Sequence, residues 1–221
     1  WGRGEIEQRT PAELFVQVSV GGAHACGVRP DGIIRCWGAN GLGQTQVPPM
    51  EDFIQVAAGG AFTCGLRASG VVVCWGDDSQ HQLNAPSEPF TQISAGAAHV
   101  CGITQADSQL ICWGRSIAAL DERMTPVLVV PSADRAKYPT TEFTQVSAGF
   151  SHTCALKPSG QAACWGDNTF GQRDAPLDQT FIQISAGMTE TCGVTRDDGQ
   201  VLCWGEPVFE PSHVLKNGDD H

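Results

Sequence analysis

The sequence predicts an all-β fold, specifically a β-propeller, from three observations. A repeat of about 38 residues recurs along the chain, each repeat contains its own pair of cysteines, and turn residues are abundant. The 221 residues include 26 Gly and 13 Pro, whereas only 17 % are charged. Frequent turn residues between short, alternating apolar stretches are typical of a fold with many short strands. A period near 40 predicts one propeller blade per repeat, with four strands in each blade.

Each repeat begins with the phrase Phe-x-Gln-(Val/Ile)-(Ser/Ala)-(Ala/Val)-Gly. The phrase starts at Phe15, Phe53, Phe90, Phe143 and Phe181, so the spacings are 38, 37, 53 and 38 residues. The long spacing marks an insertion in the third repeat. The repeats therefore span residues 1–205 with an insertion at 115–142, and residues 206–221 form a C-terminal tail. The first strand alternates, with Val16, Val18 and Val20 opposite Phe15, Gln17 and Ser19, and both faces are expected to be buried between blades.

Small residues end each phrase, at Ala95-Gly96, Ala148-Gly149 and Ala186-Gly187. They suit an inner strand where blades converge on the axis.

The cysteines predict a hairpin in every repeat. If the two cysteines of a repeat lie opposite each other on antiparallel strands, the turns are Pro30-Asp31-Gly32, Ala68-Ser69-Gly70 and Pro158-Ser159-Gly160. A glycine at the last position of a three-residue loop is what a type I turn with a left-handed residue requires. The other two loops have four residues, 105–108 and 196–199. Counting from the turn places every cysteine at a non-hydrogen-bonded position, within disulfide range. Five disulfides are predicted: Cys26–Cys36, Cys64–Cys74, Cys101–Cys112, Cys154–Cys164 and Cys192–Cys203.

Disulfides and charge together restrict the compartment and the partners. Five disulfides persist only in an oxidising compartment, so the protein is expected to be secreted, periplasmic or at the cell surface. The net charge of −11 argues against nucleic acid and anionic membranes, which need a cationic face. No apolar run approaches the roughly 18 residues that a membrane span needs, so no membrane insertion is expected.

The repeats resemble those of the regulator of chromosome condensation family. The residues that carry the resemblance are 148–156 with Gly160, then Cys164-Trp165-Gly166-Asp167-Asn168 and Gly171-Gln172, and it extends over nearly the whole chain. The paired cysteines are similar to those of exported members. The resemblance implies a β-propeller, usually of seven blades. The phrase Trp-Gly-x-Asn-x-x-Gly-Gln also resembles the repeats of the beta-lactamase inhibitor protein II type.

Five repeats leave the number of blades open. Trp1-Gly2 resembles the end of a repeat, so the favoured interpretation is a six- or seven-bladed propeller whose first blades lie upstream. The alternatives are a five-bladed ring and an open arc completed by another chain. An open arc is expected to assemble, because an unpaired blade exposes apolar surface and strand backbone.

No residue pattern predicts catalysis, a metal or a cofactor. There is no nucleophile elbow, phosphate loop or His-Glu-x-x-His. A histidine two residues before a cysteine, at His24, His99 and His152, is compatible with zinc, but Phe62 and Glu190 occupy the same position in other repeats. These histidines are therefore interpreted as structural. His81 beside Asp77 and Asp78 is interpreted as part of a solvated turn.

Two places are predicted to contact a partner. The insertion collects much of the scarce positive charge, in Arg123, Arg135 and Lys137, beside Tyr138. The positions that follow the repeat glycine, which the inhibitor type uses to grip its target, hold Phe150 and Met188. The predicted function is a non-enzymatic, extracellular module for protein interaction, self-assembly or structural support. The alternatives are a secreted enzyme inhibitor and a carbohydrate-binding propeller.

Overall fold

The computed structural model describes residues 13–115 and 142–206, and within these ranges all regular structure is β-strand. Fifteen strands form five antiparallel sheets of three strands each. The strands are β1 (Gln17–Val20), β2 (His24–Val28) and β3 (Ile34–Gly38) in sheet 1; β4 (Phe53–Ala58), β5 (Phe62–Arg67) and β6 (Val72–Gly76) in sheet 2; β7 (Phe90–Ala95), β8 (His99–Thr104) and β9 (Leu110–Gly114) in sheet 3; β10 (Gln145–Ala148), β11 (His152–Leu156) and β12 (Ala162–Gly166) in sheet 4; β13 (Phe181–Ala186), β14 (Glu190–Thr195) and β15 (Val201–Gly205) in sheet 5.

The prediction of four strands in each blade is wrong, because the stretch after the third strand folds as turns. In sheet 1 the side chain of Asn40 accepts a hydrogen bond from Thr45 N at 3.1 Å. The side chain of Gln44 accepts one from Leu42 N at 2.9 Å. These amides satisfy backbone groups that would otherwise pair with a strand. Pro48 and Pro49 follow, and proline has no N–H to donate to a ladder.

The predicted hairpins are confirmed to the residue. In sheet 1 the turn is closed by Arg29 N, which donates to Ile33 O at 2.9 Å. Gly32, the last residue of that turn, has a φ of 77°, a left-handed conformation that glycine adopts without steric cost. In the four-residue turn of sheet 3, Thr104 N donates to Gln109 O at 2.9 Å. The additional residue therefore falls in the turn and leaves the cysteine register unchanged.

All five predicted disulfides are confirmed. In every sheet the first cysteine lies directly opposite the second on the neighbouring strand, as for Cys64 on β5 and Cys74 on β6. The Cα atoms of the five pairs are 4.0 to 4.1 Å apart. This close approach is characteristic of non-hydrogen-bonded pairs in antiparallel sheets. A disulfide thus links the second and third strands of every described sheet.

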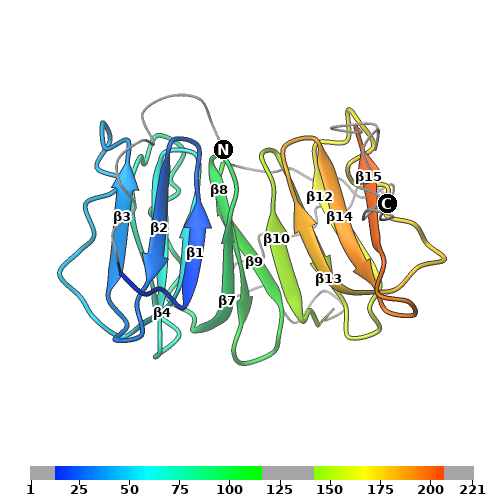
Figure 1. Cartoon of the computed structure of the whole chain (residues 1–221), viewed down its shortest axis with the longest axis horizontal. Coiled ribbons are helices and arrows are strands. Elements are labelled where there is room, and N and C mark those ends of the chain that lie inside the picture. The colour runs from blue at the N-terminus through cyan, green and yellow to red at the C-terminus, as the bar shows by residue number, and fades with distance from the viewer. Residues whose placement is uncertain (1–12, 116–141, 207–221) are drawn as a thin grey trace, which may run out of the picture.

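The five sheets stand in chain order, from the blue sheet 1 at the left to the orange sheet 5 at the right (Figure 1). Their first strands converge, which confirms the prediction for the small residues at the ends of these strands. A Cβ atom on Gly21 would lie 2.2 Å from Gly59 O of sheet 2, and one on Gly96 would lie 2.3 Å from Gly149 O. Only glycine allows the backbones of neighbouring sheets to come this close.

The hydrophobic core lies between the sheets. We call the contact between two consecutive sheets a joint, and the four joints each contain one buried cluster. The joint between sheets 1 and 2 contains Val28 and Ile34 from one sheet with Phe53, Val56 and Trp75 from the next. Burying such side chains stabilises the fold by about 1.5 to 3 kcal/mol each.

Glutamine side chains form the polar part of every joint. Gln17 Nε2 donates to Val56 O at 2.9 Å, and Gln17 Oε1 accepts from Val56 N at 2.8 Å. Gln55 makes the same two bonds with Ile93, and Gln145 makes them with Ile184. Because the first strand is an edge strand, these amides cap N–H and C=O groups that would otherwise be unpaired.

In three sheets the tryptophan of the Trp-Gly pair connects the sheet to the turn of the preceding one. Trp75 Nε1 donates to Gln44 O at 3.0 Å, and Thr63 Oγ1 donates to the same carbonyl at 2.9 Å. Trp113 and Trp204 make the equivalent bond to Gln82 O and Gln172 O. The Asn…Gly-Gln turn is therefore the element that presents a carbonyl oxygen to the next sheet.

The expectation that both faces of the first strand are buried is wrong for sheet 1. Val18 and Val20 are each 59 % exposed, whereas the equivalent Val56 and Ala58 of sheet 2 are 1 % and 5 % exposed. No sheet described by the structure packs on this side. Among the described residues, sheets 5 and 1 share no hydrogen bond, and they lie at opposite sides of the molecule (Figure 1). The described blades therefore form an open arc, and the alternative of a five-bladed ring is wrong.

Candidate functional site

A row of short turns connects the first and second strands along one rim of the arc. Backbone hydrogen bonds join each turn to the next: Gly60 N donates to Ala97 O at 3.1 Å, and Ala97 N donates to Phe150 O at 3.3 Å. Phe150 N donates in turn to Gly187 O at 2.9 Å. We call the five equivalent residues of these turns the rim row: Gly22, Gly60, Ala97, Phe150 and Met188. The bonds fix their backbones relative to one another.

Only two members of the rim row carry a large side chain. Phe150 is 54 % exposed and Met188 is 65 % exposed, and the two occupy equivalent positions on neighbouring sheets. The other members have no side chain or a methyl group. Glycine is required at Gly60, because a Cβ atom there would lie 2.4 Å from Ala97 O. The rim is therefore flat over sheets 1 to 3 and apolar over sheets 4 and 5.

Acidic residues flank the rim row where the third strands of sheets 4 and 5 end. Asp167 N donates to Ser151 O, and Glu206 N donates to Thr189 O, one residue after Phe150 and Met188 respectively. Asp167 accepts hydrogen bonds from Thr169 and Gln172, and these bonds lower the pKa of its carboxyl. The apolar pair thus lies beside carboxylates, a combination that favours an apolar partner surface with basic residues nearby.

The structure describes two of the six residues that were predicted to contact a partner. The structure places Phe150 and Met188 together on the exposed rim, although their binding role stays a prediction. Arg123, Arg135, Lys137 and Tyr138 lie outside the described residues.

The cysteines beside the three histidines are all in disulfides, and a cysteine must be a thiolate to bind zinc, so they do not complete a histidine–cysteine zinc site. His24 Nε2 lies 2.8 Å from Thr63 Oγ1 of sheet 2, and His99 and His152 form the same pair with Thr153 and Thr191. Over residues 13–115 and 142–206, no group of three or more His, Cys, Asp or Glu side chains has the arrangement of a metal site. The structural interpretation of these histidines is supported.

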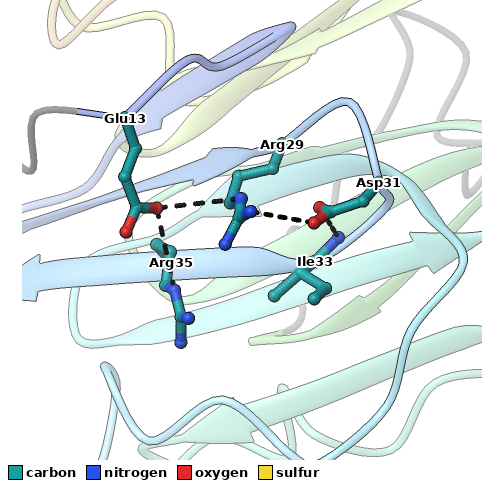
Figure 2. Close-up of polar contacts among 5 residues, drawn as sticks. All are labelled: Glu13, Arg29, Asp31, Ile33 and Arg35. Carbon is teal, nitrogen blue, oxygen red and sulfur yellow. Dashed lines mark hydrogen bonds and ion pairs between the residues drawn. The ribbon is translucent and has the colours of Figure 1, made fainter.

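An exposed ion-pair cluster lies at the leading end of the arc (Figure 2). Arg29 Nη2 lies 2.9 Å from Asp31 Oδ2, and Glu13 Oε2 lies 3.8 Å from Nε of both Arg29 and Arg35. Asp31 also accepts from Ile33 N at 3.2 Å inside the turn. The cluster thus links Glu13, which precedes β1, to the hairpin of sheet 1. Because its charges are paired with one another and partly solvated, it contributes little to stability.

The comparison with known families agrees with this geometry. The family model described as "Regulator of chromosome condensation (RCC1) repeat" matches residues 15–44, 53–82 and 143–172. These three units are RCC1 repeats. Each matched RCC1 range begins at or near the first strand and ends on the glutamine of the turn, Gln44, Gln82 or Gln172. The main-chain oxygen of each of these glutamines accepts a hydrogen bond from a tryptophan of a later sheet. The RCC1 repeat thus includes the turn that makes this bond.

Three RCC1-like or propeller proteins are similar to this chain. The ultraviolet-B receptor UVR8 of Arabidopsis thaliana is 34 % identical over 76 residues, covering 28 % of this chain and 17 % of the receptor. The CRINKLY WD40 ectodomain of the receptor kinase ACR4 from Arabidopsis thaliana superposes with a TM-score of 0.69 at 31 % identity, covering 90 % of this chain and 66 % of that one. The ectodomain of the receptor kinase CR4 from Physcomitrella patens gives 0.71 at 26 %, covering 92 % and 55 %.

The architecture is therefore a β-propeller, as predicted, and three of its five described units match the RCC1 repeat. This chain spans about two thirds or less of each of these relatives. The sequence did not predict which residues form the joints. The glutamine and serine of the opening phrase recur in nearly every repeat, and that recurrence was the signal that they bind a neighbouring sheet. In the described residues no helix has the length and hydropathy of a membrane span.

Proposed function

We propose that this chain is a non-enzymatic protein-interaction module of an oxidising, extracellular compartment, and that it binds its partner through the rim row. The observation that carries the proposal is the exposed pair Phe150 and Met188 on a backbone that is fixed by hydrogen bonds. Exposed aromatic and methionine side chains on a rigid scaffold are typical centres of protein interfaces. Because Asp167 and Glu206 flank the pair, the partner is expected to present apolar side chains beside lysine or arginine.

Two further observations support the compartment and the mode of action. The described residues contain five disulfides, and such bonds persist in an oxidising compartment, whereas a reducing cytosol keeps cysteines as thiols. The two receptor-kinase ectodomains to which the chain is similar are domains named for their place outside the cell. A stiff surface loses little conformational entropy on binding, so a small apolar contact suffices for useful affinity.

The test compares capture of extracellular proteins by three forms of the chain. The wild type, the double variant F150S/M188S and the control variant L177S are immobilised with intact disulfides. Leu177 is 94 % exposed but lies in the turn before β13, away from the rim row. A partner that meets the proposal is retained by wild type and L177S, and its Kd is raised about thirtyfold by F150S/M188S, since losing a central apolar anchor costs about 2 kcal/mol.

A partner that binds all three forms equally would contradict the rim row as the binding surface. A separate variant lacking residues 116–141 tests the predicted contribution of Arg123, Arg135, Lys137 and Tyr138. If those residues also contact the partner, their removal weakens binding most at low ionic strength, because exposed charges are screened by salt.

A further inference from the structure

The turns that follow β3, β6 and β12 share one hydrogen bond, in which a side-chain oxygen at the second turn position accepts from a main-chain N–H further along the turn. The acceptors are Asn40, Asp78 and Asn168, and the donors are Thr45, Leu83 and Arg173, at 3.1, 3.0 and 2.8 Å respectively. Such bonds are typical of turns built by Asn and Asp. We call these three segments the equivalent turns. Their shared geometry allows the chemistry of single positions to be compared.

The main-chain nitrogen that follows this acceptor is bonded in two of the equivalent turns but not in the third. In sheet 2, Ser79 N donates to Asp77 Oδ1 at 3.0 Å, and the same bond in sheet 4 is 3.1 Å long. Sheet 1 has Ala39 in place of that aspartate. Within the described residues, the N–H of Gly41 therefore has no hydrogen-bond acceptor. The nitrogen next to the Asn40 side chain is thus not held in place.

Asn40 and Gly41 are also accessible to solvent. Both are exposed, and a Cβ atom on Gly41 would have no heavy atom within 4 Å apart from its chain neighbours. The exposure belongs to the turn itself, since Asp78 and Ser79 of the inner sheet 2 are exposed as well. Glycine has no side chain to shield its nitrogen, and its backbone is the most free to rotate. The Asn40 carboxamide can thus reach the nitrogen of Gly41 once it leaves its exposed bond to Thr45.

Asparagine is a thermally labile residue, and we infer that Asn40 is a site of spontaneous deamidation with water as the co-reactant. The nitrogen of Gly41 attacks Cγ of Asn40, so that an N–Cγ bond forms and the Cγ–Nδ2 bond breaks. The leaving nitrogen takes the proton of the Gly41 amide and departs as ammonia, which leaves a cyclic succinimide. Water then opens the ring at one of its carbonyl carbons. Addition at Cγ gives aspartate, whereas addition at the main-chain carbonyl carbon gives isoaspartate, in which the chain continues through Cγ.

The two products differ in their effect on the joint between sheets 1 and 2. Aspartate keeps the turn, because Asp78 occupies the same position in sheet 2 and makes the same bond. Isoaspartate places Cγ in the main chain, which lengthens the turn and displaces the oxygen that binds Thr45 N. Gln44 O, which accepts from Trp75 and Thr63 of the next sheet, lies in this segment. Isoaspartate is therefore expected to weaken that joint, whereas aspartate only adds a negative charge to a chain of net charge −11.

The test follows deamidation by peptide mass spectrometry while the folded chain, with its disulfides intact, is incubated in mildly alkaline buffer. The tryptic peptide 36–67 contains Asn40 and no other asparagine. Its mass is expected to rise by the difference between water and ammonia, with fragment ions placing the change at position 40 and isoaspartyl methyltransferase labelling the isoaspartate form. The peptide that contains Asn168 is the internal control and should change far more slowly. A second Asn-Gly pair, Asn217-Gly218, lies outside the described residues, and tryptic cleavage at Lys216 separates it.

Three variants separate the contributions of the glycine and of its unbonded nitrogen. A39D supplies the aspartate of sheets 2 and 4 and should slow the reaction about fivefold, because a hydrogen bond to the attacking nitrogen must then break. G41A shields the same nitrogen at a position with room for the methyl group, and should be at least as slow. D167A/T169G copies the turn of sheet 1 into sheet 4, so Asn168 should then react at about the rate of Asn40.

Stability measurements distinguish the two products. N40D should unfold at the temperature of the unreacted wild type, whereas wild type enriched in isoaspartate should unfold at a lower temperature. A peptide 36–67 that changes no faster than the Asn168 peptide would overturn the inference, and so would an A39D variant that reacts at the wild-type rate. A39D installs a residue that the chain already carries in two equivalent turns, so it is expected to fold. The reaction is independent of the proposed binding surface, whose exposed pair lies on sheets 4 and 5.

Discussion

Three buried histidines connect neighbouring sheets through a threonine hydroxyl. Thr63 Oγ1 donates its proton to Gln44 O, so it accepts from His24, and His24 Nε2 carries the proton of the ring. The same reasoning applies to His152 with Thr191. The Nδ1 atoms of His24 and His152 are buried without a hydrogen-bond partner. A second proton on either ring would be buried without an acceptor, so the folded protein favours neutral histidines.

Stability is therefore predicted to fall in mild acid. Burial lowers the pKa of His24, His99 and His152, and it lowers that of His99 to about 4. The histidines of the unfolded chain take up protons below their ordinary pKa of about 6.5, whereas those of the folded chain take them up at lower pH, His99 only near pH 4. Stability from this source is complete above pH 6.5 and declines from there toward pH 4. For His99 alone the expected loss of stability between pH 7 and pH 4.5 is about 2.4 kcal/mol, and urea unfolding at the two pH values tests it.

The neighbouring joint supplies the matched control for this prediction. Phe62 and Val100 occupy the histidine and threonine positions in the joint between sheets 2 and 3 and share its buried cluster. The double variant H99F/T153V copies that pair. It should unfold with a shallower pH dependence than the wild type. An unchanged pH dependence would show that His99 is not the group responsible.

A second residue-scale prediction concerns the tryptophans. W75F removes the donor to Gln44 O and should cost about 1 kcal/mol beyond the smaller ring, because a neutral hydrogen bond contributes about that much. W37F is the comparison, since Trp37 donates no hydrogen bond within the described residues. Thermal unfolding of both variants measures the difference. Equal losses would contradict a role for the Trp75–Gln44 bond.

At the scale of the element, each sheet is a hairpin closed by a disulfide and preceded by an inner strand. The turn residues set the register, and the register brings the cysteines opposite each other. The inner strand then depends on the preceding sheet, because its free edge is capped by that sheet's glutamine. A single sheet therefore leaves its apolar surface and one strand edge uncovered, and the joints are needed for stability.

Removing a disulfide is predicted to cost about 3 kcal/mol through the entropy of the unfolded chain. The double variant C64A/C74A should lose more than this, because Cys64 is fully buried and the alanines leave a cavity. C192A/C203A should lose little more than the cross-link contribution, because Cys203 is exposed at the trailing end. Urea unfolding of the two oxidised variants gives the comparison. A larger loss for C192A/C203A would contradict this account of the core.

At the scale of the whole molecule, the described residues form an arc of two outer sheets with one joint each and three inner sheets with two. The middle sheets are buried on both faces, whereas β1 has an exposed edge. Local opening requires less free energy where fewer contacts are broken. The sheets of the molecule are therefore expected to differ in stability although their sequences repeat.

Amide hydrogen exchange of dilute protein tests this gradient. The amides of Val18 and Val20 on β1 should exchange faster than those of Val56 and Ala58 on β4, since the latter donate to Gln17 and Ser19. Equal protection of β1 and β4 in dilute solution would contradict the exposed edge.

The sequence by itself determined the units of this protein. The repeat phrase, the turn glycines and the cysteine spacing predicted the hairpins and all five disulfides, because register in a hairpin follows from turn length and a period of two residues. Their place after the repeat glycine also marked Phe150 and Met188 as predicted partner contacts, and the structure adds that both side chains are exposed.

Only the tertiary structure decided how the units fit together. The fourth strand was wrongly predicted because the amides of Asn40 and Gln44 compete with a ladder, and side-chain competition is not visible in a hydrophobic pattern. The partners of Gln17 and His24 lie 39 residues away, on the next sheet. The burial of Val18 was wrongly predicted for the same reason: a repeat is identical at the end and in the middle of an arc, and only the presence of a neighbouring sheet determines which faces are buried.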